Sequence, residues 1–434
     1  MYTSVRNAPE TPEGAAAAPP PGATPRGRMR TRVGGTVVAM GMVSFFTDAS
    51  AEMVTAVLPL FLILQVGLTP LQYGVVDGVY QGVTVLLRLV GGYAADRWRR
   101  PKLVCTVGYG LSAVTKLGLL GVGSAASTSL VLAVDRSGKG LRTAPRDAII
   151  AAAADPALLG RSFGVHRALD TAGAMLGPLL AFAVLTAVPD GYSSVFVASF
   201  CVAVIGVALL VLVVPDIRWS PVEEAMRVSL RGVGRLLRDR RMLSLTVAAG
   251  LLGLVTVSDG FVYLSLQQRL QVPAEVFPLF LLASSAVYLV LAIPMGRLAD
   301  RIGRRTLFVA GHVGLLALYL LLLGPTPDWL ACAGSLALLG AYYACTDGVL
   351  SAGAAEILPA GLRTSGLALV QTALAGGRML SSLLFGLLWT VTGGQRGALA
   401  AFAVALVLVL PLAVRLIVVP GRRAAAAGGA GAAG

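Results

Sequence analysis

Long apolar runs, separated by short polar stretches, form the pattern along most of the chain. About 20 mainly apolar residues suffice to cross a bilayer as a helix, and lipid offers no water to satisfy an open backbone. We therefore expect an all-α polytopic membrane protein with twelve transmembrane helices. The predicted segments are 34–65, 71–95, 102–123, 128–153, 161–187, 192–214, 242–268, 276–299, 305–323, 328–356, 363–391 and 397–418.

Basic residues occur in alternate connections between these segments. They follow segment 2 (97–102), segment 6 (215–241) and segment 8 (301–305), whereas no Lys or Arg follows segments 1 and 3. Basic connections favour the cytoplasmic side of a membrane. We therefore expect a multi-pass protein of the cell (cytoplasmic) membrane, with both termini and the central linker in the cytoplasm.

Composition supports a bilayer environment and excludes several soluble classes. Of the 434 residues, 56% are hydrophobic and 13% are charged, about half the charged fraction of a soluble domain. The net charge of +14 could indicate nucleic-acid binding, but the basic residues lie between apolar runs and not on one soluble face. The four cysteines lack metal-ligand spacing, and no HExxH or triad pattern indicates an enzyme. We expect no nucleic-acid partner, no cofactor, no metal and no enzymatic activity.

A short pattern occurs twice, at a constant offset of 204 residues. GGYAADRWRR (91–100) follows segment 2, and MGRLADRIGRR (295–305) follows segment 8. Such internal repeats are typical of transporters whose site lies between two halves. We expect two six-helix halves at 33–214 and 242–418, a basic linker at 215–241 and disordered tails at 1–32 and 419–434.

The repeated pattern resembles the GxLADRxGRR signature of the major facilitator superfamily, and the resemblance extends over about residues 33–418. The second copy matches well, whereas the first has Arg99 where glycine is usual, followed by Pro101. The resemblance implies a cytoplasmic latch in which each Asp pairs with basic residues and caps a neighbouring helix. The latch residues are Asp96, Arg97, Arg100, Asp300, Arg301 and Arg304. Charge that only sets topology is the alternative, but it does not account for the paired Asp residues.

Two further patterns resemble signatures of proton antiporters in the superfamily. LAVDRSGKGL (132–141) is similar to the fourth-helix pattern LxxxRxxxG, which implies a part in proton transfer for Arg136. GAMLGP (173–178) matches the GxxxGP core of the antiporter signature, although LLAF follows where a glycine pair is expected. Because small residues four apart are also a general helix-packing pattern, these matches favour export only slightly.

An ionisable group deep in a bilayer is costly unless it is paired or hydrated, so its position is informative. The resemblance implies that helices 1, 4, 7 and 10 line a central cavity. Helix 1 carries Asp48 and Glu52 on one face, helix 7 carries Asp259 and helix 10 carries Asp347. Elsewhere, comparable charges are found only in segments 2, 5 and 11: Asp77, Arg88, His166, Arg167, Asp170 and Arg378.

Helix 4 is the most charged span, because it contains DRSGKGLRTAPRD (135–147). A phosphate loop is excluded, since the GxxxxGK[ST] spacing and a preceding strand are missing. At 100° per residue its charges fall on two faces, one for the cavity and one for helix 5, and we expect Pro145 to kink the helix. Two interpretations stay open: a substrate or proton site, and a structural salt-bridge network between helices 4 and 5.

The charged residues divide by depth into four predicted groups. Proton coupling is expected from Asp48, Glu52, Arg136 and Lys139, because a deep pair of acids beside cations can take up a proton. The expected substrate-cavity residues are Arg142, Asp259, Asp347 and Arg378. Arg146 and Asp147 lie nearer the cytoplasm and join the gate. The expected helix 4–5 network contains Asp135, His166, Arg167 and Asp170, with His166 in a structural hydrogen bond.

These observations predict a secondary active transporter that works by alternating access. The leading function is proton-coupled efflux of a small organic molecule by a monomer. Proton-coupled import of an anionic metabolite is an alternative, supported by the four cations of helix 4. A receptor or assembly protein that kept the fold without transporting is another, although such a protein could lose its charged cavity helices. No residue identifies the substrate.

Overall fold

The structure is a computed structural model and describes residues 33–83, 100–155, 158–216, 238–347 and 363–417. Within these ranges every regular element is a helix. The named helices are α1 (Gly35–Leu64), α3 (Pro101–Gly118), η1 (Leu119–Gly121), α4 (Ala125–Ala153), α5 (Leu159–Ala187), α6 (Tyr192–Leu212), α8 (Arg240–Leu254), α9 (Asp259–Leu270), η3 (Ala274–Val276), α10 (Pro278–Ile302), α11 (Arg304–Leu323), α12 (Asp328–Thr346), α14 (Arg363–Val391) and α15 (Gln395–Ile417). Residues 70–83 are also helical.

The predicted all-α membrane fold is confirmed. Ten helical segments in the described part of the chain are long and apolar enough to cross a membrane, with residues 240–270 taken as one. Helix α4, with 29 residues, is also long enough to cross a membrane. It is not among the ten because the many charged residues at 135–147 make it too polar. The chain is a multi-pass membrane protein.

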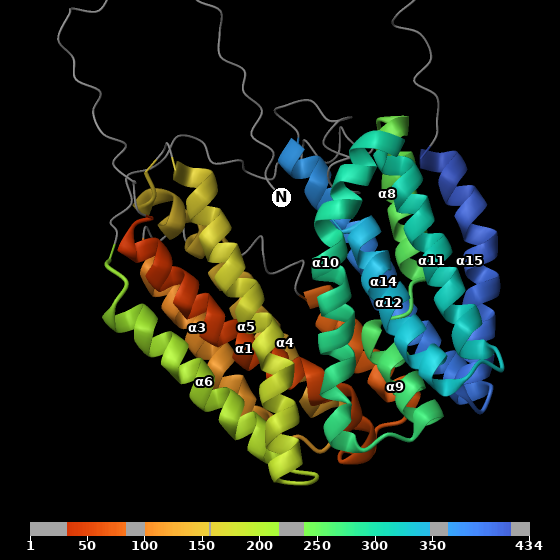
Figure 1. The fold of residues 1–434 in the computed structure, drawn as a ribbon, viewed down its shortest axis with the longest axis horizontal. Helices are drawn as coiled ribbons and strands as arrows, with labels where there is room; N and C mark the ends of the chain where they lie inside the picture. Colours follow the sequence, from red (N-terminus) through yellow and green to blue (C-terminus); the bar gives the residue numbers. More distant parts are fainter. Residues whose placement is uncertain (1–32, 84–99, 156–157, 217–237, 348–362, 418–434) are drawn as a thin grey trace, which may run out of the picture.

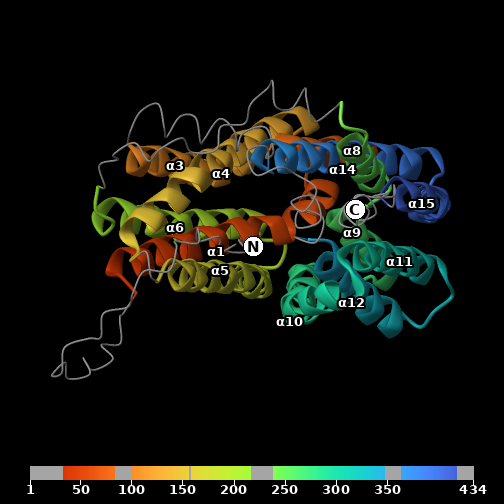
Figure 2. The same ribbon diagram turned by 90° about the horizontal axis from the view of Figure 1, so that it is seen from above.

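The helices form two bundles (Figure 1), one containing α1 and α3–α6 and the other α8–α15. We call the end at which α1 begins and α15 ends the termini end, and the opposite end the far end. The bundles lie closer together at the far end than at the termini end (Figure 1). Seen from above, α5 lies beside α10 (Figure 2), and these two helices are in contact.

The seventh span is interrupted, which corrects the continuous helix expected at 242–268. Helix α8 ends at Leu254 and α9 begins at Asp259. Backbone groups released in a membrane need new partners, and neighbouring helices supply them. Tyr319 accepts a hydrogen bond from the Val257 amide (2.8 Å) and donates one to the Val255 carbonyl (3.0 Å). Ser381 donates to the Thr256 carbonyl at 2.5 Å.

Helix α12, in the tenth span, also ends earlier than the helix expected there. Helix α12 stops at Thr346, and Asp347 has extended backbone angles, whereas the prediction placed Asp347 inside a helix at 328–356. A Cβ atom on Gly311 of α11 would touch Cys345 and Thr346. Gly311 is the eighth residue of α11, so the end of α12 lies well inside the bundle.

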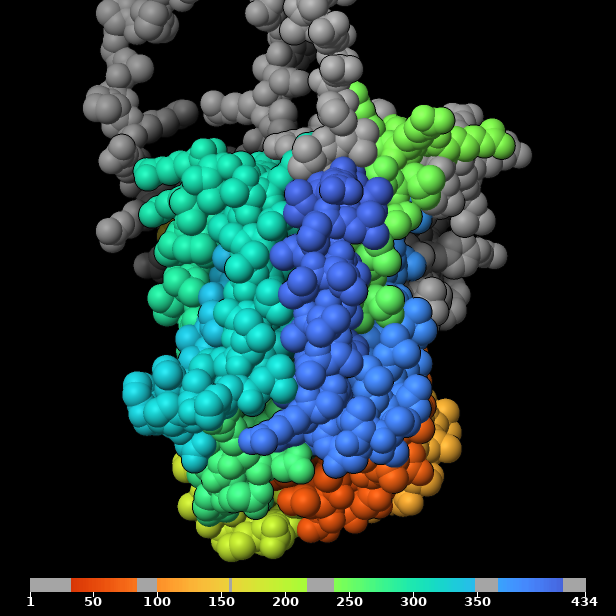
Figure 3. All heavy atoms as spheres, turned by 90° about the vertical axis from the view of Figure 1, so that its right-hand side faces the viewer, coloured from red at the N-terminus to blue at the C-terminus, as the bar shows by residue number. Residues whose placement is uncertain are grey.

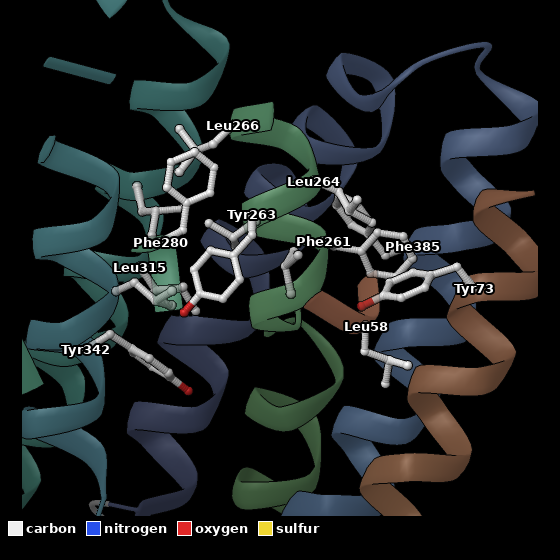
Figure 4. Packing of buried hydrophobic residues seen from close by; sticks show 14 of the residues in the cluster. Leu58, Tyr73, Phe261, Tyr263, Leu264, Leu266, Phe280, Leu315, Tyr342 and Phe385 are labelled. Carbon is white, nitrogen blue, oxygen red and sulfur yellow. The ribbon is translucent and has the colours of Figure 1, made fainter. Parts of the chain in front are cut away.

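Aromatic side chains pack the two bundles together at the far end. Tyr73 meets Phe261 edge-on with ring centroids 4.8 Å apart, and Phe261 also contacts Phe385 and Trp389. Figure 4 shows Tyr73, Phe261 and Phe385 pointing toward one another. In the space-filling view the first bundle reaches beneath the second at this end (Figure 3). The boundary between bundles is therefore closely packed at the far end.

Candidate substrate and proton site

A row of alternating acids and bases runs through the first bundle, and we call it the charge ladder. Helix α4 supplies six of its ten members and α1, α3 and α5 supply the others. From the far end to the termini end its members are Lys116, Asp135, Arg136, Glu52, Lys139, Asp48, Arg142, Asp170, Arg146 and Asp147. Such charges persist in a membrane only when each faces a partner or water.

The far rung of the ladder is a buried ion pair between α3 and α4. Lys116 lies 2.8 Å from Asp135, and the same carboxylate accepts hydrogen bonds from Ser112 (2.6 Å) and Thr115 (3.1 Å). Asp135 was expected in the helix 4–5 network, and that assignment is corrected, because its partner is on α3. Lys116 was not predicted as a charge within the membrane. The signal for it was Asp135, because an acid inside a span needs a basic partner.

Arg136 lies in the middle of the ladder, between α4 and the helix at 70–83. It donates to the Tyr80 hydroxyl, and its guanidinium lies 3.7 Å from the centroid of the Tyr80 ring. A small pocket opens here, with Tyr80, Lys116 and Arg136 among its lining residues. Glu52, half-buried on α1, interacts electrostatically with Lys139 and Arg136. The four residues predicted to couple protons thus form neighbouring rungs.

Nearer the termini end, two arginines of α4 bracket carboxylates of α1 and α5. Arg142 donates to Asp48 at 3.2 Å and lies 4.3 Å from the centroid of the Tyr109 ring. Arg146 lies 3.0 Å from Asp147 and 3.6 Å from Asp170. The structure therefore brings the cavity residue Arg142 and the gate residue Arg146 into one network with α5.

Helix α5 contributes three of the predicted network residues. Arg167 pairs with Asp170 at 3.3 Å. His166 is buried, and neither ring nitrogen has a hydrogen-bond partner among the described residues. The structural hydrogen bond expected for His166 is therefore not found among the described residues.

The second bundle presents a smaller polar group around the end of α12. Tyr343 donates to Asp259 at 2.6 Å. Arg378 donates to the Tyr342 hydroxyl at 3.5 Å and lies 5.6 Å from the Tyr343 ring centroid. Asp347 is exposed just beyond α12. The three residues predicted for the cavity here do come together, and the two tyrosines between Asp259 and Arg378 were not predicted.

Asp77 connects the helix at 70–83 directly to α14 of the second bundle. Its carboxylate accepts a hydrogen bond from Ser382 of α14 at 2.5 Å. A Cβ atom on Gly74 or Gly78 would touch the α14 backbone at Ser382 and Met379, so the backbones approach closely here. A glycine at every fourth residue of 74–82 was the available signal, because small residues at this spacing favour close helix contact.

The latch is described in part. Asp300, near the end of α10, lies 3.7 Å from Arg304 at the start of α11. Arg301 is exposed on α10, and Arg100 is the N-cap residue of α3. Asp96 and Arg97 lie outside the described residues, as does Arg88. Asp300 and Arg304 of the second copy are therefore neighbours, and their role in a latch stays a prediction.

The membrane-spanning helices, together with the charged groups buried within them, are typical of secondary transporters. The family model for the Major Facilitator Superfamily matches residues 40–287 and 260–433. An uncharacterized MFS-type transporter of Methanocaldococcus jannaschii is 30% identical over 365 residues, 82% of this chain and 89% of that protein. The chain belongs to the major facilitator superfamily and is a transporter of that fold.

A second relative matches a shorter part of the chain. Two solved structures match most of it, but at low sequence identity, so they show similarity of fold alone. An uncharacterized protein of Mycobacterium tuberculosis is 36% identical over 159 residues, 36% of this chain and 38% of that protein. The crystal structure of the nucleoside transporter NupG covers 89% of this chain and 100% of its own, with a TM-score of 0.76 and 15% identity. A mutant of the peptide transporter POT covers 90% of this chain and 95% of its own, with a TM-score of 0.72 and 15% identity.

Proposed function

We propose that this protein is a proton-coupled secondary transporter that exports a small, polar organic molecule by alternating access. The observation that carries the proposal is the charge ladder, because membrane interiors keep ionisable groups chiefly where protons, ions or substrates pass. The bundles at 33–214 and 242–418 are proposed as the two moving halves. In the proposed orientation the termini end faces the cytoplasm of a cell membrane, following the basic connections.

Asp48 and Glu52 are proposed as the proton acceptors. Both lie on α1, and each faces a cation of α4, since Arg142 donates to Asp48 and Lys139 interacts with Glu52. A proton on either carboxylate removes the negative charge that holds the cation. The contact between α1 and α4 then weakens, which favours one of the two openings of the cavity.

The proposed substrate is polar and carries groups that both signs of charge can bind. Asp259, Arg378 and two tyrosine hydroxyls offer such groups in the second bundle, and Glu52 and Lys139 offer them in the first. Structural neighbours include transporters of nucleosides and of peptides, two classes of small polar organic molecule. Import of an anion is less well supported, because Arg136, Lys139, Arg142 and Arg146 each face an acid.

Export is proposed as the direction on the basis of two patterns. GAMLGP in α5 and the arginine pattern around Arg136 in α4 resemble antiporter signatures of the superfamily. In the antiport scheme a proton enters as the substrate leaves, so a carboxylate must release one partner to hold the other. Asp48 and Glu52 each face a cation of α4, which a proton could displace in such an exchange.

Flux into proteoliposomes under an imposed pH gradient tests the proposal. The probes are labelled nucleosides and dipeptides, and a pH-sensitive dye inside the vesicles reports proton movement. We expect movement of at least one probe against the direction of proton flow, with loss of the pH dependence in Asp48→Asn and Glu52→Gln. Asp190→Asn, on the exposed turn after α5, is the matched control and should behave as the parent. Unchanged gradient-driven flux in both α1 variants would contradict the proposal.

A further inference from the structure

We propose that Asp48 and Asp170 bind one proton between them and act as a single carboxyl pair linking α1 to α5. This inference deepens the proposed function, on which its role in transport rests, by naming the partner of Asp48. The predicted roles had grouped Asp48 with Glu52, its neighbour on the same helix, and Asp170 with a structural network.

Close packing of two backbones forces the carboxyl groups together. A Cβ atom on Gly173 of α5 would collide with the Phe45 carbonyl of α1, and one on Gly177 would collide with Ala49 and Glu52. Phe45 and Ala49 flank Asp48, and Gly173 is one turn from Asp170. Because side chains one turn apart share a helix face, this contact directs Asp48 and Asp170 toward each other.

The two carboxyl groups are neighbours across this contact, since arginines one turn apart on α4 hold one each: Arg142 lies beside Asp48 and Arg146 beside Asp170. The buried Asp170 Oδ1 has no hydrogen-bond partner among the described residues. Two ionised carboxylates offer only acceptors, so a hydrogen bond between them requires that one carries a proton. Like charges at this separation oppose ionisation of both groups. The pair consequently holds a single proton and titrates as one unit.

Cations surround the pair without neutralising both of its members. Arg142 of α4 lies 3.2 Å from Asp48, while Arg146 of α4 and Arg167 of α5 lie 3.6 Å and 3.3 Å from Asp170. The remaining titratable groups that face the cluster are Glu52 on α1, Tyr109 on α3, Lys139 and Asp147 on α4, His166 on α5 and Tyr288 on α10. Arg142 and Arg146 contact the two carboxyl groups whether or not the pair carries its proton.

The pair is not fully enclosed. The side chains of Asp48 and Asp170 are 14% and 16% exposed, whereas that of Arg167, one turn nearer the termini end, is 70% exposed. Charged side chains therefore continue from the pair along α5 to an exposed position. Removal of the proton adds a negative charge beside Arg142 and Arg146, which flank Pro145 in α4. Pro145 removes one backbone hydrogen bond of this helix, so the added charge attracts α4 at a point where the helix can bend.

Infrared difference spectroscopy of the purified protein in lipid vesicles tests the inference without any substrate. A protonated carboxyl group has a C=O stretching band that shifts in heavy water, and a pH step reveals the groups that release protons. With Glu52 replaced by Gln throughout, so that its own carboxyl band is absent, we expect a titrating band that is lost in both Asp48→Asn and Asp170→Asn, because either amide leaves the other carboxylate ionised and hydrogen-bonded. Asp190→Asn should retain the band.

A titrating band that persists unchanged in Asp170→Asn overturns the inference, since Asp48 would then bind its proton alone. Loss of the band in both variants, with substrate flux that ignores the pH gradient, supports the carboxyl pair and contradicts the proposed function. Asp170→Glu is the conservative companion: restored acid chemistry at this position should restore a titrating band if the variant folds, as judged by size-exclusion chromatography. A variant that folds but lacks the band counts against the pair.

Discussion

The Arg142 guanidinium of α4 and the Asp48 carboxylate of α1 lie 3.2 Å apart, with the Tyr109 ring beneath the arginine. Only 5% of the Arg142 side chain is exposed, so its guanidinium has no bulk water to take the place of Asp48. A buried ion pair of this kind contributes little net stability, but loss of one partner leaves an uncompensated charge.

The first prediction concerns this pair. Arg142→Gln should lower the free energy of unfolding by about 3 kcal/mol, because Asp48 loses its buried partner. The measurement is the unfolding midpoint in detergent. Arg396→Gln, at an exposed position, should change the midpoint little. The double variant Arg142→Gln with Asp48→Asn should recover part of the loss, and a fully additive double variant would mean that the pair is not coupled.

The second prediction uses two glycines of α5 with opposite surroundings. Gly173→Ala should lower the free energy of unfolding by at least about 1–3 kcal/mol, because the added Cβ atom would overlap the α1 backbone at Phe45. Gly164→Ala should stabilise by up to about 1 kcal/mol, since the space beside Gly164 is open and alanine favours a helix. Unfolding midpoints of the two variants against the parent give the comparison. Equal shifts would contradict close contact between α1 and α5.

The third prediction concerns the interruption between α8 and α9. Tyr319→Phe should lower the free energy of unfolding by about 1–3 kcal/mol, because two buried backbone groups at Val255 and Val257 lose their partner. Tyr192→Phe is the matched control, since the buried Tyr192 hydroxyl has no hydrogen-bond partner among the described residues. Thermal unfolding in detergent measures both. A loss in Tyr192→Phe as large as in Tyr319→Phe would argue against this role.

The fourth prediction concerns the contact between the bundles at the far end. Ser382→Ala removes the donor to Asp77 and should favour separation of the bundles there by about tenfold, the value of one hydrogen bond to a charged group. The readout is the rate at which a thiol reagent labels Tyr73→Cys, a buried position, with the four native cysteines replaced by serine. Ser335→Ala, also a buried serine, should leave the rate unchanged. Equal rates in all three proteins would exclude a locking role for Asp77.

Much of the fold followed from the chain because lipid imposes simple rules. Apolar length predicts spans, and eleven predicted segments correspond to named helices of the structure. The interruption at 255–258 was not predictable in the same way. Val255, Thr256 and Val257 lack Gly or Pro, and the partners that stabilise the open backbone come from Tyr319 and Ser381, far along the chain.

The charged site was predictable as a set of residues but not as a set of pairs. The cost of charge in lipid identified α4 and its acids and bases. Which acid meets which base depends on how closely helices approach: Asp135 pairs with Lys116 because α3 adjoins α4, and Asp170 reaches Asp48 because Gly173 admits the α1 backbone. Helix periodicity gives the face of one helix and not the distance to its neighbour.

The interruption in the seventh span also determines where the protein can bend. Helix α8 packs against α14 and α15, whereas Gly260 and Phe261 of α9 touch Tyr73 of the other bundle. The four residues between these two rods do not continue the α-helical ladder, so a change in the angle between α8 and α9 would not require either helix to unwind. A bend at this point would lie within the seventh span rather than in the linker at 215–241.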